Sequence, residues 1–181
     1  MKAGKRYGGG EDLNGELLEQ LYAAYYRELY LYVYALCRRR GMTEDILQET
    51  FLKAFTALKD SHTNMRAWLY MVARNLCFNS MKREKKNVPA DLGEAMESRQ
   101  DAGQDVLEGI LWDERKRMLW EAMYRLESQR REILILQYFG GFSQREIAAM
   151  LRLSPENVRV QVHRAKKELK RCLEVMHYDV S

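Results

Sequence analysis

The sequence predicts an all-α protein of two small helical domains joined by a flexible acidic linker, the C-terminal domain being a helix-turn-helix. Apolar side chains recur at helical spacing through most of the chain, and no stretch shows the alternation of a half-buried strand. Only two prolines occur, as expected where helix interiors dominate. A polar segment near the middle loses the helical pattern and divides the chain.

Composition bounds the class of protein. Of the 181 residues, 46% are hydrophobic and 31% charged, which is typical of a soluble globular chain. No apolar run approaches the roughly 20 residues of a membrane-spanning helix. Glycines follow the basic N-terminus where a secretory signal would be apolar, so we expect a cytoplasmic protein. Cys37, Cys77 and Cys172 are too scattered for a zinc site, and we expect no metal and no cofactor.

Residues 1–12 are assigned to an N-terminal tail and residues 13–86 to the first domain. Apolar periodicity predicts three helices there, which run from Glu16 to Cys37, onward from an N-cap at Thr43 that follows a break at Gly41, and from Met65 to about Lys82. The second of these has a polar face formed by Asp45, Gln48, Glu49 and Lys53. By pattern alone, such a face is more often simply solvated than a protein-docking surface.

The third predicted helix carries a face that a core does not explain. It consists of Trp68, Met71, Asn75, Phe78 and Lys82, opposite the apolar stripe of the same helix. A basic tail that includes Arg83 follows. Rings and an amide beside cations suit a surface for unpaired bases and their backbone. For each ring alone, packing on a neighbouring helix is the favoured alternative.

The segment 87–109 is predicted to be the linker, because it lacks periodicity and contains Pro89, Gly93 and Gly103. Between Val88 and Lys116 there are eight acidic residues against three basic ones. A segment of this charge will not bind phosphates.

The second domain, residues 110–175, contains the most informative motif. Gly140 and Gly141 can end one helix, and Ser143 with Glu146 forms a capping box for the next. A three-residue turn then leads to Ser154 as N-cap and Pro155 at the first helical position, where its missing N–H costs nothing. Two helices joined in this way form a helix-turn-helix.

The helix that begins at Pro155 has the properties of a DNA-recognition helix. Val158 and Val162 face inward, whereas four outward side chains lie near its start: Arg159, Val160, His163 and Arg164. Seven basic residues, Lys167 among them, stand against two acidic ones between Arg152 and Arg171, enough to neutralise phosphates. The charges alone would fit a solvated amphipathic helix, but the capped turn favours DNA binding.

Together these motifs resemble the bacterial sigma factors of the extracytoplasmic-function (ECF) group. The segment TEDILQETFLKAF (43–55) resembles the helix that docks on the clamp of the RNA polymerase largest subunit. MRAWLYMVARNLCFNSMKREKK (65–86) resembles the segment that melts and reads the minus-ten promoter element. The segment 126–169 resembles the domain that reads the minus-thirty-five element.

The resemblance implies a role for each matching position. It implies that Asp45, Gln48, Glu49 and Lys53 bind core polymerase, that Arg159, Val160, His163, Arg164 and Lys167 contact the minus-thirty-five duplex, and that Asn75, Asp60, Ser61, His62, Lys82 and Arg83 bind the minus-ten element. It also implies an anti-sigma factor as a partner. The polymerase, and not the sigma factor, would catalyse.

Two rival functions are weighed against this one. A free-standing regulator would need a sensory N-terminal domain, and no α/β ligand-binding pattern is present. A nuclease with a carboxylate-bound metal could use Asp45 and Glu49, which lie at i,i+4 spacing, but a plausible third ligand is missing. A promoter-directing function with no enzymatic activity is therefore the expected one.

Overall fold

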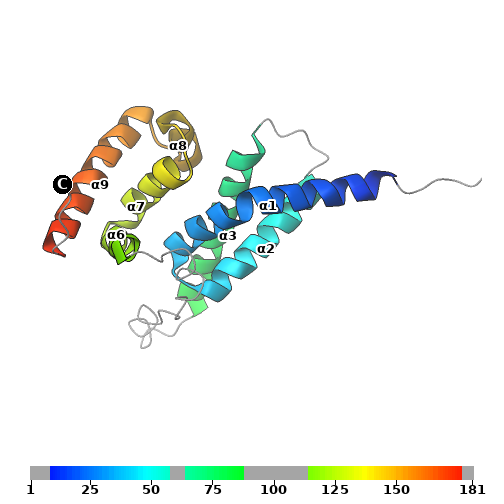
Figure 1. Ribbon diagram of the computed structural model, residues 1–181, viewed down its shortest axis with the longest axis horizontal. Coiled ribbons are helices and arrows are strands. Elements are labelled where there is room, and N and C mark those ends of the chain that lie inside the picture. The colour runs from blue at the N-terminus through cyan, green and yellow to red at the C-terminus, as the bar shows by residue number, and fades with distance from the viewer. Residues whose placement is uncertain (1–8, 58–63, 88–113, 177–181) are drawn as a thin grey trace, which may run out of the picture.

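The computed structural model describes residues 9–57, 64–87 and 114–176, and every regular element within these ranges is helical (Figure 1). The first domain contains α1 (Gly9–Cys37), α2 (Arg40–Ala57) and α3 (Met65–Asn87). The second contains α6 (Glu114–Tyr124), α7 (Ser128–Leu134), a π-helical segment η2 (Ile135–Phe139), α8 (Gln144–Leu151) and α9 (Pro155–Val175). The all-α prediction is confirmed; the linker and the loop with Asp60, Ser61 and His62 lie outside the described residues.

The first domain is a three-helix unit whose core forms where the apolar stripes of its helices meet. Leu29 of α1, Leu47 of α2 and Leu69 of α3 are all almost completely buried. Each such side chain contributes about 1.5–3 kcal/mol relative to exposure. The N-terminal part of α1 extends beyond α2 and α3 (Figure 1), and α1 is longer than the helix predicted from Glu16.

The predicted start of α2 was wrong. Thr43 is not its N-cap, because α2 begins at Arg40 and contains Gly41. Arg38, with a φ of 56°, makes the reversal between α1 and α2 in the left-handed region. The Thr43 hydroxyl instead donates to the Arg39 carbonyl oxygen at 2.8 Å, one turn back. A threonine can bond in either way, so the sequence signal for a cap was ambiguous.

Both predicted caps of the helix-turn-helix are confirmed. Ser143 Oγ accepts from the backbone N–H of Glu146, whose carboxylate accepts in return from the Ser143 N–H at 2.8 Å. Arg152 ends α8 in the left-handed conformation, and the Asn157 N–H donates to Ser154 Oγ at 3.1 Å at the start of α9. The local sequence therefore defines the turn between α8 and α9.

Replacing Ser154 by alanine removes the acceptor for the Asn157 N–H. We expect the free energy of unfolding of the second domain to fall by about 0.5–2 kcal/mol, because one donor at the start of α9 loses its partner. Urea unfolding followed by circular dichroism measures this loss. Ser128→Ala is the matched control: Ser128 is exposed on α7 and is not its N-cap, so a change within about 0.5 kcal/mol is expected.

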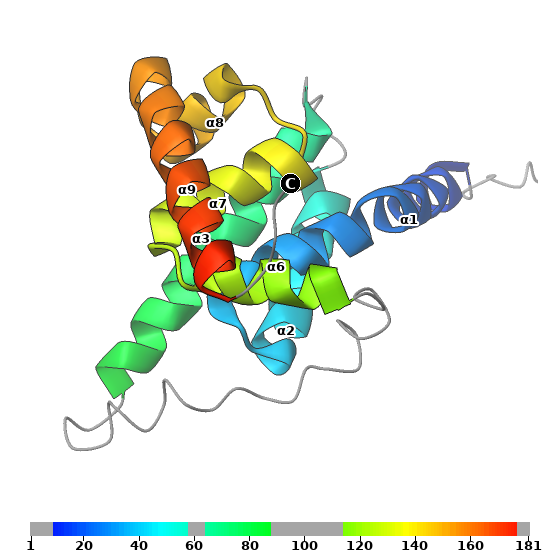
Figure 2. The ribbon, with the colours of Figure 1, turned by 60° about the vertical axis from the view of Figure 1, so that its left-hand side comes forward.

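The two domains pack against each other, with α7 lying between α9 and the helices of the first domain (Figure 1), and Figure 2 shows the same packing from another side. The ring of Tyr70 on α3 meets that of Phe142 edge-on, with centroids 4.9 Å apart. The guanidinium carbon of Arg38 lies 4.0 Å from the centroid of the Tyr124 ring, and this cation–π contact also joins the two domains. Glu132 of α7 is bonded to Tyr32 and Arg74 of the first domain. The sequence made no prediction of this placement.

Candidate nucleic-acid interfaces

The outer face of α9 is positioned by the burial of its inner face. Val158, Val162 and Ala165 are buried against α7 and α8. The five side chains predicted to contact the minus-thirty-five duplex are all exposed: Arg159, Val160, His163, Arg164 and Lys167. An ion pair also joins α7 to α9, in which Arg130 Nη1 donates to Glu168 Oε2 at 2.6 Å. The structure thus brings these five residues together on one rigid, cationic helix face.

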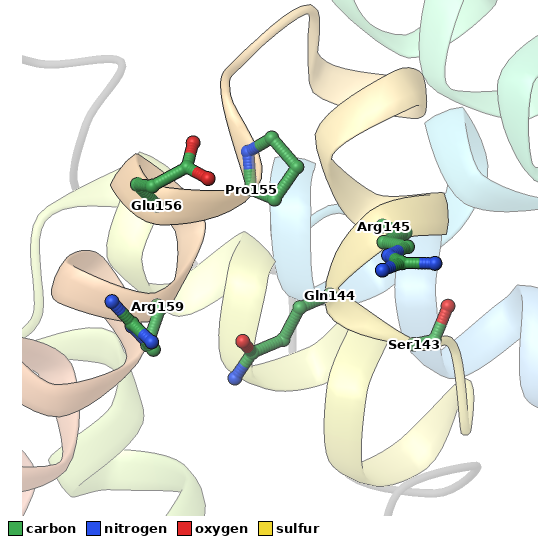
Figure 3. A pocket seen from close by; sticks show the side chains of 6 residues that line it. All are labelled: Ser143, Gln144, Arg145, Pro155, Glu156 and Arg159. Atoms are coloured by element: carbon green, nitrogen blue, oxygen red, sulfur yellow. The ribbon is translucent and has the colours of Figure 1, made fainter.

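A shallow pocket lies between the N-termini of α8 and α9 and adds residues that the sequence reasoning missed. Figure 3 shows its lining, formed by Ser143, Gln144, Arg145, Pro155, Glu156 and Arg159. Gln144 and Arg145 begin α8, where the backbone N–H groups of the first turn and the helix dipole favour an anion. Their position directly after the capping serine was the signal that could have identified them.

The predicted aromatic and amide face of α3 is present, with one exception. Asn75 and Lys82 are exposed, and Met71 and Phe78 keep 43% and 37% of their surface accessible. Trp68, in contrast, is partly buried against the core, so the packing alternative holds for this ring. Arg83 is also exposed, at the basic end of the helix.

Arg74 belongs beside this face, although the sequence reasoning did not select it. Its guanidinium carbon lies 4.6 Å from the centroid of the Phe78 ring, a cation–π contact. The same guanidinium binds the Glu132 carboxylate in the second domain. An arginine one residue before Asn75 and stacked on Phe78 could have been noticed from the helical spacing alone.

The polar face of α2 is exposed as predicted. Asp45, Gln48, Glu49 and Lys53 all lie at the surface, and Lys53 Nζ is 3.5 Å from Glu49 Oε1. This surface continues into a groove between α1 and α2 that is mostly apolar. Its lining is Leu18, Tyr22, Tyr26, Glu44, Gln48, Phe51 and Leu52.

Large apolar side chains of this groove are exposed at the surface. Tyr22 is 47% and Leu52 60% exposed, and the Tyr22 ring stacks on that of Tyr26 at 4.5 Å. A contiguous exposed apolar patch can mark a protein interaction site, whereas single exposed apolar side chains are common. The sequence indicated excess tyrosine but did not single out Leu52.

Two further findings concern the residues that the structure describes. Within them, no group of three or more His, Cys, Asp or Glu side chains is arranged to hold a metal ion. Among the helices that the structure describes, none is long and apolar enough to span a membrane.

Two family patterns match this chain, one in its N-terminal half and one in its C-terminal half. The pattern of Sigma-70 region 2 matches residues 21–87, which include most of α1 and all of α2 and α3. The pattern of Sigma-70 region 4 matches residues 116–169, from α6 into α9. The chain belongs to the sigma-70 family, in its ECF group. This sigma factor directs promoter-specific transcription initiation by core RNA polymerase, with region 2 melting the minus-ten element and region 4 binding the minus-thirty-five element.

Two similar proteins are sigma factors of Bacillus subtilis. The sigma factor is 28% identical over 156 residues to RNA polymerase sigma factor YlaC of Bacillus subtilis, covering 85% of this chain and 90% of the relative. It is 24% identical over 170 residues to ECF RNA polymerase sigma factor SigX of the same species, covering 91% and 88%.

Two solved structures share the fold. CnrH in complex with the cytosolic domain of CnrY gives a TM-score of 0.63 at 23% identity, covering 89% of this chain and 90% of that chain. The sigma factor RpoE of Bartonella quintana, in complex with the anti-sigma factor NepR, gives 0.63 at 23% identity and covers 91% and 98%.

Proposed function

We propose that Asn75 of α3 contacts an unstacked minus-ten base, with Met71 and Phe78 supplying apolar surface beside it. Lys82 and Arg83 bind the backbone of the same strand, and the loop residues Asp60, Ser61 and His62 complete the base pocket. The exposed amide between accessible apolar side chains supports this assignment. Stacking and backbone neutralisation are the two interactions that hold single-stranded DNA.

For the minus-thirty-five duplex, we propose that Arg159, Val160, His163 and Arg164 reach base edges and that Lys167 binds phosphate. The N-terminal residues of a recognition helix enter the major groove, and arginine pairs bidentately with guanine there. Gln144 and Arg145 at the start of α8 contact the backbone beside it. The observation that carries the proposal is the exposed cationic face of α9 on a confirmed helix-turn-helix.

Core polymerase binds to Asp45, Gln48, Glu49 and Lys53 in this proposal, with Leu52 and the neighbouring groove adding apolar contact. Residues 13–86 and 110–175 act as separate domains on the linker 87–109. Once polymerase holds the first domain, the second is present at a high effective concentration near its DNA site. Each domain can then contribute through a modest interface.

The sigma factor acts in the cytoplasm, without a cofactor and without catalytic activity of its own. Its binding faces serve polymerase and DNA, and the chemistry of RNA synthesis belongs to the polymerase. We also propose an anti-sigma factor as a partner. This is supported by the two solved structures of the same fold, in which CnrH is bound to CnrY and RpoE to the anti-sigma factor NepR.

The Asn75→Ala variant tests the minus-ten assignment in a reconstituted system of sigma factor, sigma-free core polymerase and promoter DNA. We expect promoter opening, measured by permanganate reactivity of unpaired thymines, to fall while the affinity for core polymerase stays unchanged. The fold and the polymerase-binding face should be unaffected, because the Asn75 side chain is exposed on α3, away from the polar face of α2. Gln20→Ala, which removes an exposed amide from α1, is the control and should open the promoter normally.

Loss of core binding in Asn75→Ala would show that the residue is structural and would contradict the assignment. Absence of both complex formation and specific transcription with the unmodified protein would contradict the proposal as a whole. A free-standing regulator would instead retard duplex DNA without polymerase.

A further inference from the structure

The Glu132 carboxylate is buried where the two domains meet. Glu132 of α7 is 2% exposed, and two donors of the first domain bind it. Tyr32 Oη donates to Glu132 Oε1 at 2.7 Å, and Arg74 Nε donates to the same oxygen at 2.7 Å. Arg74 Nη2 also donates to Oε2 at 3.4 Å. The carboxylate is therefore satisfied by residues 100 and 58 positions away in the chain.

This arrangement couples the charge of Glu132 to the docking of the domains. Burial of a carboxylate is costly unless it is paired and hydrogen-bonded, and here both donors come from the other domain. Burial and the neighbouring Glu132 carboxylate raise the pKa of Tyr32 well above its usual value, so its hydroxyl keeps the proton that it donates. The bonds to Glu132 hold only while α7 stays packed on α1 and α3.

The docked arrangement cannot serve both promoter elements. The start of α8, next to the recognition helix, packs on α3, because Phe142 lies against Tyr70 and the guanidinium of Arg66. Minus-ten and minus-thirty-five elements are about 25 base pairs apart, which is about 85 Å of duplex at roughly 3.4 Å per base pair. Two small domains in direct contact cover far less than that distance. The domains must separate before both elements can be bound.

Arg74 links this closed arrangement to the minus-ten face. Its guanidinium stacks on Phe78 and precedes Asn75 in the chain, so it lies at the edge of the surface assigned to the single strand. In the docked arrangement the Glu132 carboxylate occupies it. A carboxylate and a phosphate bind a guanidinium in the same bidentate manner, so each can replace the other.

We propose that Glu132 is a latch that keeps the free sigma factor closed, and that opening transfers Arg74 from this carboxylate to a phosphate of the minus-ten single strand. The transfer of Arg74 rests on the proposed role of α3, whereas the latch rests on the interface alone. Opening breaks the bonds from Tyr32 and Arg74 together and exposes Glu132 to water. No covalent change is needed.

The first experiment measures closure without DNA. Small-angle X-ray scattering on the full-length protein compares the wild type with Glu132→Gln, Arg74→Gln and Tyr32→Phe. We expect a larger radius of gyration in Glu132→Gln and Arg74→Gln, and a smaller increase in Tyr32→Phe, which keeps the ion pair. Glu121→Gln, which neutralises an exposed carboxylate on α6, should stay as compact as the wild type. Circular dichroism checks that each variant retains its helices.

The second experiment measures affinity for a short, fluorescently labelled single-stranded DNA of random sequence, because a phosphate contact does not depend on sequence. Glu132→Gln frees Arg74, and we expect binding about tenfold tighter than the wild type, equivalent to about 1.4 kcal/mol. The slope of the logarithm of the binding constant against the logarithm of the salt concentration should steepen by about 0.7. This is the value for one added phosphate contact on a single strand. Arg74→Gln should open equally but bind no tighter than the wild type, and the double variant should match it.

The two experiments test the Glu132 latch and the transfer of Arg74 to phosphate separately. If Glu132→Gln and Arg74→Gln remain as compact as the wild type, the latch is wrong. If both open and bind the DNA equally tightly, the transfer of Arg74 to phosphate is wrong. Failure of the wild type to open a promoter with core polymerase would contradict the proposed function, while the scattering result would still decide the latch.

Discussion

Arg164→Ala is expected to weaken binding to the minus-thirty-five duplex by about 1–3 kcal/mol and to relax base preference at one position, because an arginine pairs bidentately with one base. Arg159→Ala should have an effect of the same size at a different position. Both side chains are exposed on α9 near its capped start, so truncation leaves the core of the domain intact. Fluorescence anisotropy of the polymerase complex on promoter variants measures affinity and base preference together.

Lys167→Ala, on the same helix, is expected to weaken DNA binding without changing base preference. A lysine on phosphate should lose affinity equally for all sequences, and the salt slope should decrease by about 0.9. Arg125→Ala, which removes an exposed arginine in the turn after α6, is the control and should change neither quantity. Unchanged promoter output in both Arg159→Ala and Arg164→Ala would show that α9 does not read the duplex.

Ile147→Ala is expected to lower the free energy of unfolding of the second domain by about 2–5 kcal/mol. Ile147 lies on α8 and is completely buried, so truncation leaves a cavity between α8 and the helices that it packs on. Urea unfolding followed by circular dichroism measures the change. The variant should therefore lose promoter binding indirectly, at temperatures where the helix-turn-helix is no longer folded.

Val160→Ala is the matched control, because it truncates an aliphatic side chain of the same motif that is 43% exposed. Its stability should stay within about 0.5 kcal/mol of the wild type, while its promoter preference changes. A loss below about 1 kcal/mol in Ile147→Ala would contradict the packing of α8 described here.

The helix-turn-helix was predictable in detail because its signals are local. Ser143 with Glu146, and Ser154 with Pro155, each act within one helical turn, so the same bonds form wherever the segment lies. The start of α2 was not predictable in this way. Thr43 can cap a helix or bond back to the preceding turn, and in the structure its hydroxyl bonds back to Arg39 because α2 already begins at Arg40.

The residues of the interface could not be found from the pattern. Glu132 follows Arg130 and Arg131 in a polar stretch, where a carboxylate is usually solvated. Its burial depends on Tyr32 and Arg74, and nothing in the spacing of three distant residues indicates that they meet. Trp68 shows the same limit, because the neighbouring helices decided that its ring is partly buried.

By itself, the sequence determined the helices, the capped turn and the exposed faces of α2, α3 and α9, because helical periodicity and capping are properties of neighbouring residues. Only the tertiary structure decided how the two domains lie against each other. That placement brings Glu132 to Arg74, and it depends on contacts between surfaces that lie far apart in the sequence, which no local pattern records.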